Sequence, residues 1–200
     1  MKKLLAGILL LSIQYTITSC NNGGESSTSS TATDTTTKMS TTEDTTTMGS
    51  QTNNTGGVSE AQNDFVNTAA TAGMMEIELG KAAQANGASA GVKDFGSMMV
   101  TDHTAAANEL KSIASKNNIA VPSAMTSEQD MHVKDMSAKK GAEFDKAYIG
   151  MMVEGHEKVL AAFKKAATEE TNADLKSFAI KTAPVIQKHL DKAKNLKSKM

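Results

Sequence analysis

Arginine and tryptophan are absent from this sequence of 200 residues, so all 21 basic residues are lysine. Arginine is the residue that binds phosphates and guanine bases in bidentate geometry, and its absence argues against a nucleic-acid-binding protein. The formal net charge of -1 argues the same way, because nucleic-acid-binding domains usually carry a strongly basic face. No nucleic-acid partner is therefore expected.

Cysteine occurs once, at Cys20, so no disulfide can form within the chain. Tyr148 is the only tyrosine beyond the first 20 residues, and aromatic residues make up 4% of the chain. The core must therefore consist mainly of aliphatic residues and methionine, together with the five phenylalanines. The sequence shows neither a nucleophile–base pair nor a Gly-rich phosphate loop, and we expect a protein that is not an enzyme.

The N-terminus has the pattern of an export signal. Two lysines at positions 2 and 3 precede the apolar residues 4–13, a run too short to span a bilayer but typical of a signal peptide. The run leads to Ile17-Thr18-Ser19-Cys20, which resembles the lipobox of bacterial lipoproteins. The resemblance implies that residues 1–19 are removed and that Cys20 is lipidated, which anchors the chain to a membrane.

The residues around the anchor predict its membrane and its distance from the domain. Asn21 stands where an Asp would direct retention in the inner membrane, so we expect the outer membrane of the cell envelope. Residues 21–57 are rich in Ser and Thr and lack aromatics, Leu, Ile and Val, which predicts a disordered tether over 20–57. The alternative is an ordinary signal peptide with an incidental cysteine, which would leave a free thiol exposed.

From residue 58 to residue 200, apolar residues recur with the period of α-helices, and no strand-like alternation competes. The apolar stripes of four long helices run from Phe65 to Ala83, Val92 to Ile113, Phe144 to Phe163 and Leu175 to Leu196. A short helix is predicted near residues 126–140, and Pro184 is expected to kink the last long helix. The expected fold is an all-α four-helix bundle with an extra short helix in the crossover between long helices 2 and 3.

Each long helix also places one side chain that can bind a metal on or near its apolar face. In chain order these side chains are Glu76, His103, His156 and His189. Met99 stands one turn before His103, Met152 stands one turn before His156, and Asp102 directly precedes His103. The fourth histidine, His132, lies in the crossover and is expected at the surface.

Two interpretations of this inward-facing set remain open from the residues. Imidazole with carboxylate suits iron, zinc or manganese, and thioether from methionine would favour copper. Alternatively, the four residues form a hydrogen-bonded polar layer that fixes the register of the helices. Methionine also fills gaps in cores that are short of aromatics, so its presence does not by itself indicate a metal.

Several motifs in order carry a family resemblance. They are Met75-Glu76-Ile77-Glu78-Leu79-Gly80, Val92-Lys93-Asp94-Phe95-Gly96, Met99-Val100-Thr101-Asp102-His103, Phe144-Asp145-Lys146-Ala147-Tyr148 and Gly155-His156-Glu157. Over about residues 60–197 the chain resembles the bacterial family DUF4142, which implies a ferritin-like bundle without an established activity. Di-iron ferritin-like proteins carry Glu-x-x-His on two helices. Here the residue three positions before each histidine is Val100, Val153 or Ile186, and none is Glu, which disfavours di-iron oxidase chemistry.

The sequence therefore supports two functions. The first is a membrane-anchored envelope lipoprotein whose helical bundle binds an unidentified ligand without catalysis. The second is a metal-binding or metal-buffering ferritin-like protein that uses Glu76, His103, His156 and His189, with Met99, Met152 and Asp102 as secondary candidates.

Overall fold

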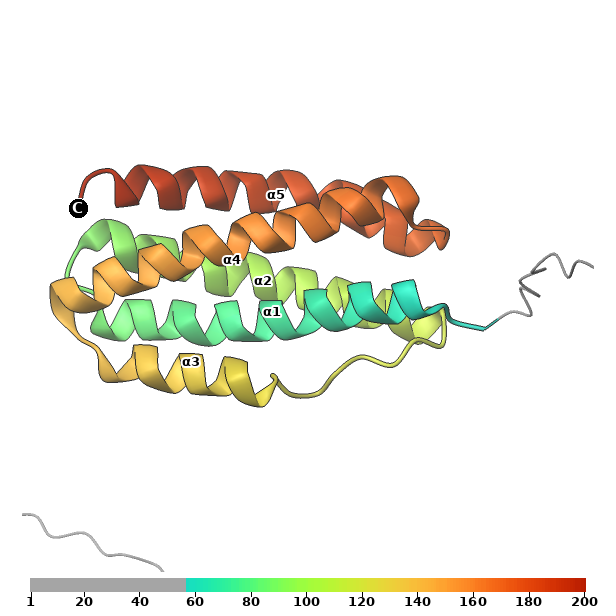
Figure 1. Ribbon diagram of the computed structural model, residues 1–200, viewed down its shortest axis with the longest axis horizontal. Helices are drawn as coiled ribbons and strands as arrows, with labels where there is room; N and C mark the ends of the chain where they lie inside the picture. Colours follow the sequence, from blue (N-terminus) through green and yellow to red (C-terminus); the bar gives the residue numbers. More distant parts are fainter. Residues whose placement is uncertain (1–56) are drawn as a thin grey trace, which may run out of the picture. The chain divides into compact units, whose positions relative to one another are not determined.

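The computed structural model describes residues 57–200, which form five helices and no strand (Figure 1). The helices are α1 (Glu60–Asn86), α2 (Ala90–Lys116), α3 (Ser127–Ala138), α4 (Gly141–Glu169) and α5 (Ala173–Lys197). The predicted all-α fold is confirmed, with four long helices and a short helix in the crossover. The kinship with ferritin-like bundles stays a prediction. The predicted signal peptide, the lipidated Cys20 and nearly all of the tether lie outside the described residues.

The four long helices pack so that each contacts two others: α1 with α2 and α4, and α5 with α2 and α4. Short turns join α1 to α2 and α4 to α5, which makes both pairs antiparallel (Figure 1). The crossover carries the chain back along α1 through α3, so that Gly141 at the start of α4 lies beside Gly87 at the end of α1. Among residues 57–200, no helix is both long and apolar enough to cross a membrane.

Side-chain caps set the ends of the helices. Ser59 and Gln62 form a capping box at the start of α1, and Ser89 accepts a hydrogen bond from the backbone N–H of Val92 at the start of α2. A second capping box, from Thr126 and Gln129, begins α3. The short helix ends at Ala138, slightly before the predicted end, and α5 continues through Pro184 without a break.

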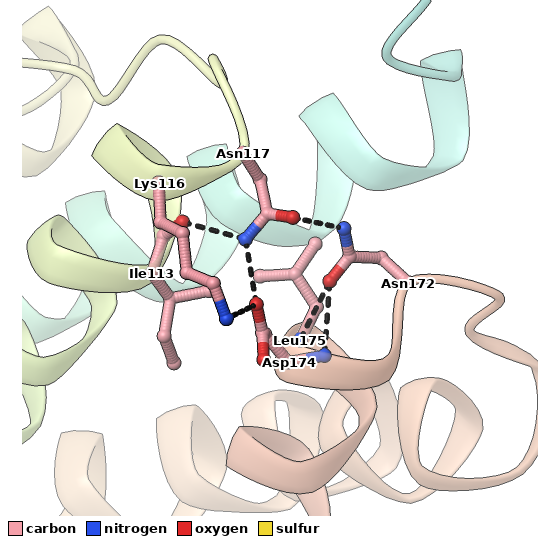
Figure 2. A network of polar contacts seen from close by, with 6 residues as sticks. All are labelled: Ile113, Lys116, Asn117, Asn172, Asp174 and Leu175. Carbon is pink, nitrogen blue, oxygen red and sulfur yellow. Dashed lines mark hydrogen bonds and ion pairs between the residues drawn. The ribbon is translucent and has the colours of Figure 1, made fainter. Parts of the chain in front are cut away.

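Polar contacts at both ends of the bundle tie neighbouring helices together. At one end, Asp145 of α4 accepts hydrogen bonds from the backbone N–H groups of Ala88 and Ser89, at 2.9 and 2.8 Å. At the other end, Asn117 donates to Asp174, at 3.0 Å, and accepts from Asn172, at 2.8 Å (Figure 2). These contacts hold the start of α5 against the end of α2, so the helices have a fixed axial register.

The core contains two aromatic clusters, one toward each end of the bundle. Phe65, Phe163 and Phe178 contact one another with ring centroids 5.0 to 6.4 Å apart. Phe95, Phe144 and Tyr148 form the other cluster, with centroids 5.4 and 6.0 Å apart. In each long helix, the predicted polar residue lies between these two clusters or beside them. The fold therefore places a polar layer in the middle of an apolar core.

Two glycines allow α1 and α2 to approach closely beside this layer. A Cβ atom on Gly96 would lie 2.6 Å from the backbone oxygen of Gly80 and 2.7 Å from the Cβ of Ala83. Gly80 lies one turn after Glu76 on α1, and Gly96 lies two turns before His103 on α2. The close contact sets the distance between the two helices where these polar side chains meet.

Candidate metal centre

The structure brings the four predicted residues together in the bundle interior. Glu76 of α1, His103 of α2, His156 of α4 and His189 of α5 are all buried. The ring centroids of the three histidines are 5.3 to 5.9 Å apart. One ligand atom from each imidazole lies within 4.8 Å of the corresponding atoms of the other two, which is a spacing that can hold a metal ion.

Glu76 takes a position behind the histidines and is not part of this group of three. Its carboxylate oxygens lie 3.2 Å from Nδ1 of His103 and 3.3 Å from Nδ1 of His156. The carboxylate therefore faces the outer nitrogens of two rings on two different helices. In this position it can hold both rings in orientation, as carboxylates commonly do behind histidines that bind a metal.

A backbone carbonyl fixes the tautomer of His156. Nδ1 of His156 lies 2.9 Å from the carbonyl oxygen of Met152, one turn earlier on α4. Because a carbonyl can only accept a hydrogen bond, Nδ1 must carry the hydrogen, and Nε2 keeps its lone pair in the neutral ring. The side chain of Met152, predicted as a secondary ligand, is buried in the core, as is that of Met99. Ligation by either thioether stays a prediction.

Asp102 plays the corresponding part for His189. The Oδ2 atom of Asp102 lies 2.9 Å from Nε2 of His189, and this contact joins α2 to α5. The carboxylate accepts a hydrogen bond from Nε2–H, so the lone pair of the neutral His189 ring is on Nδ1. The side chain of Asp102 is 38% exposed, whereas that of His189 is 1% exposed. This hydrogen bond therefore connects a buried ring to the protein surface.

One nitrogen on each ring remains without a partner among the described residues. These atoms are Nε2 of His103, Nε2 of His156 and Nδ1 of His189, and all three are buried. The other nitrogen of each ring is the one that faces Glu76, the Met152 carbonyl or Asp102. Each imidazole is thus oriented by an oxygen on one side and has a free lone pair on the other.

Burial keeps the three imidazoles neutral. It lowers the pKa of His103 to about 4, although the neighbouring Asp102 carboxylate opposes the shift. Burial also lowers the pKa of His156 and His189, against the effects of Glu76 and Asp102 respectively. Neutral imidazole is the form that binds a metal ion, so the site is in its binding form at neutral pH.

Burial raises the pKa of Glu76, with the nearby His156 opposing the shift. The cause is the low dielectric of the core, which disfavours a charge that has no compensating cation close to it. A metal ion held by the three histidines would supply such a cation a few ångströms away. The carboxylate would then be stabilised in its charged form, close to Nδ1 of His103 and Nδ1 of His156.

Tyr148 and a small cavity also adjoin the centre, and neither was predicted from the sequence. The Tyr148 hydroxyl is buried without a partner among the described residues, and burial together with Glu76 raises its pKa. A cavity of about 20 Å³, room for one water molecule, is lined by Glu76, His103, Thr182 and apolar residues. The sequence marked Tyr148 as the sole tyrosine of the domain and as part of the motif Phe144-Asp145-Lys146-Ala147-Tyr148, and neither signal placed its hydroxyl beside Glu76.

The exposed His132 lies in α3, away from the centre, as predicted, and contacts Glu128 on its own helix. The sequence also failed to indicate that a backbone carbonyl, that of Met152, would orient His156.

Comparison with known proteins identifies the family of the chain but indicates no activity or ligand for it. No curated protein and no solved structure matches the chain. A family model described as a domain of unknown function matches residues 47–196, which is most of the sequence and includes all four residues of the centre. The chain therefore belongs to the DUF4142 family.

Proposed function

We propose that the helical bundle is a metal-binding domain that holds one transition-metal ion between His103, His156 and His189. The observation that carries the proposal is the mutual spacing of the three ligand atoms, within 4.8 Å of one another. Metal–nitrogen bonds of about 2.0–2.1 Å place two ligand atoms at most about 4 Å apart. The rings therefore need to close by only a fraction of their separation to bind an ion.

The unpartnered nitrogens argue for a metal over a purely structural polar layer. A structural layer is stable when its members satisfy one another, yet each of these three rings has a buried nitrogen without a partner among residues 57–200. Leaving a buried acceptor unsatisfied costs about 1–3 kcal/mol, and here the cost is incurred three times. A single metal ion would satisfy all three lone pairs at once.

The ligand set favours zinc, copper or iron. Neutral imidazoles suit these ions, whereas magnesium and calcium require mainly oxygen ligands. Two carboxylates, Glu76 and Asp102, stand behind the rings and can balance the charge of a divalent ion. Three protein ligands also leave at least one coordination position for water or another small ligand.

We further propose that the chain displays this domain at a membrane of the cell envelope, through lipid on Cys20 and the Ser/Thr-rich segment that follows. The support is the lipobox-like sequence and the absence of aromatics, Leu, Ile and Val from residues 21–57, between the anchor and the bundle. Binding or buffering of metal, without catalysis, is the proposed role. Oxidase chemistry at two irons is not proposed, because the histidine helices lack the Glu-x-x-His pattern.

Metal analysis of the full-length protein tests the proposal. The protein would be purified in detergent without a polyhistidine tag, stripped with a chelator, reloaded with Zn²⁺, Cu²⁺ or Fe²⁺ and analysed for metal per chain. We expect one ion per chain and a higher melting temperature, since about 100-fold excess over Kd stabilises the folded state by about 2.7 kcal/mol. No bound metal and no change in melting with any of these ions would contradict the proposal.

The variant His103→Leu separates a metal site from a structural layer. In the metal-free protein it removes an unpartnered buried nitrogen, so we expect the stability to be unchanged or raised by about 1 kcal/mol. The same variant should lose the metal and the metal-dependent rise in melting temperature. If His103→Leu instead prevents folding in the absence of metal, the histidines form an obligatory structural network.

A further inference from the structure

A groove on the surface leads to the proposed metal centre between α2 and α5. It has a volume of about 300 Å³, and its lining includes His103 from α2 and His189 from α5. A water molecule occupies about 30 Å³ in the liquid, so the groove admits an ion together with part of its hydration shell. Two of the three imidazoles thus form part of the wall of a space that is open to solvent.

The other sides of the centre are closed. His156 of α4 is fully buried, and Glu76 of α1 is 2% exposed. The groove beside α1 is lined by Met74, Ile77 and residues of the crossover and of α3, and by none of the three histidines. The small cavity beside Glu76 and His103 holds only about 20 Å³, so the groove between α2 and α5 is the larger of the two described spaces that touch the rings.

Asp102 lies where this groove meets the centre. Its carboxylate lines the groove, is partly exposed, and accepts the hydrogen bond from His189. A carboxylate has about four lone-pair positions, so one hydrogen bond leaves others free to contact an arriving cation. The same side chain thus touches both the solvent side and a predicted ligand of the metal.

We propose that metal ions enter and leave the three-histidine centre through the α2–α5 groove, with Asp102 as the first protein group that contacts the ion. This inference rests on the proposed function. The incoming ion exchanges a water for a carboxylate oxygen of Asp102 and then exchanges further waters for the free nitrogens of His189 and His103. His156, at the far side, completes the coordination.

The charges along the groove favour direct contact of the cation with one carboxylate over long-range electrostatic attraction of the cation. Glu109 of α2 is paired with Lys181 of α5, with two contacts of 3.0 and 2.8 Å, so this carboxylate is already neutralised. Lys188 also lines the groove and repels cations. Asp102 is the carboxylate of the groove that faces a histidine and not a lysine, which makes it the favourable first contact.

Stopped-flow loading of the stripped full-length protein with Co²⁺ tests the path, because Co²⁺ bound to imidazoles absorbs visible light. The groove can be filled by Ala105→Trp, at an exposed position of α2 that lines it. The matched control is Ala161→Trp, at an exposed position of α4 that lines none of the described grooves. Val185→Trp fills the same groove from α5, in case the first variant folds poorly.

We expect Ala105→Trp and Val185→Trp to bind one Co²⁺ per chain but to load and release it about tenfold more slowly, since binding then requires the helices to move apart. Ala161→Trp should load like the unaltered protein. Full occupancy at unaltered rates in both groove variants would overturn the proposed path and leave the proposed function intact. Absence of binding of Co²⁺ and of Zn²⁺, Cu²⁺ and Fe²⁺ in the unaltered protein would overturn both proposals.

Discussion

The two nitrogens of each buried imidazole have different surroundings in this protein. The outer nitrogens face Glu76, Asp102 and a backbone carbonyl, and the inner nitrogens have no partner among residues 57–200. Because a neutral imidazole has one hydrogen, fixing it on the outer nitrogen directs the lone pair inward. The oxygens behind the rings therefore determine whether the centre can bind a cation.

Asp102→Asn tests whether the oxygens behind the rings control metal binding, and it does so at a partly exposed residue whose replacement leaves the core undisturbed. An amide accepts more weakly than a carboxylate, and it can turn its NH₂ group toward His189, which would favour the tautomer with the hydrogen on Nδ1. We expect metal affinity to fall about 10–100-fold with little change in metal-free stability. Competition with a chelator of known affinity measures the dissociation constant.

Asp94→Asn is the matched control for Asp102→Asn. Asp94 lies on the same helix, is exposed and makes no ion pair with the described residues, so its replacement removes the same charge without touching a ring. Its affinity should equal that of the unaltered protein. Equal affinities for all three proteins would show that Asp102 does not orient His189 for binding.

At the scale of single residues, the sequence predicted which side chains meet but could not predict how they pair. Helical periodicity placed Glu76 and the three histidines on inward faces, and the structure brings them together. Glu76 was grouped with the ligands because periodicity gives the direction of a side chain and not the contacts of its atoms. Its place behind two Nδ1 atoms depends on the rotation and spacing of three helices.

The spacing of the helices depends on contacts that lie outside the centre. Gly80 and Gly96 bring the backbones of α1 and α2 into contact, and Asp145 fixes the turn that joins these two helices. At the opposite end of the bundle, hydrogen bonds among Asn117, Asn172 and Asp174 link the end of α2 to the start of α5 (Figure 2). The residues that build the site therefore include positions that make no contact with it.

Gly96→Ala tests the close approach of α1 and α2. Alanine favours the helix by about 1 kcal/mol, but its Cβ would lie 2.6 Å from a backbone oxygen that cannot turn aside. Overpacking of this kind costs about 1–3 kcal/mol, so we expect a net loss of stability. Displacement of α1 from α2 should also weaken the contact between Glu76 and His103. Urea unfolding of the metal-free protein measures the stability.

Gly150→Ala is the control for the glycine of the α1–α2 contact. Gly150 is also helical, in α4, but a Cβ added there meets no atom within 4 Å. The change should therefore stabilise the protein by up to about 1 kcal/mol. A similar gain in Gly96→Ala would mean that the helices separate without cost and that the glycine contact does not set their distance.

At the scale of helices, the sequence was a good guide because local signals mark the ends. The capping box at Ser59 and Gln62, the cap at Ser89 and the stop at Asn86 and Gly87 all depend on neighbouring residues and could be identified without the fold. The contacts between helices were harder to predict from the sequence. The pairing of α1 with α4 depends on the path of the crossover, where the contacting residues lie far apart in the sequence.

For the molecule as a whole, the buried centre links folding stability to proton uptake and to metal binding. Three imidazoles are kept neutral by burial in the folded state, whereas in the unfolded chain they protonate with a pKa of about 6.5. Glu76 acts in the opposite direction, because its raised pKa means that the folded state binds its proton more tightly. Three histidines outweigh one carboxyl, so the unfolded state takes up more protons on acidification.

The metal-free protein should therefore lose stability as the pH falls from about 6.5 toward 4, the pKa of His103 in the folded bundle. The contribution of these histidines is complete above pH ~6.5, and each can reduce the unfolding free energy by up to about 1.4 kcal/mol per pH unit below it. Urea unfolding in the presence of a chelator, at several values between pH 7.5 and 4.5 (about one unit apart), measures the slope of the unfolding free energy against pH.

His103→Leu removes one of the three histidines and should reduce that slope. Exposed His132 provides a control, since His132→Leu should leave the slope unchanged. A stability that is constant or rises over this range would show that the three rings are protonated in the folded state, and protonated rings could not present lone pairs to a metal.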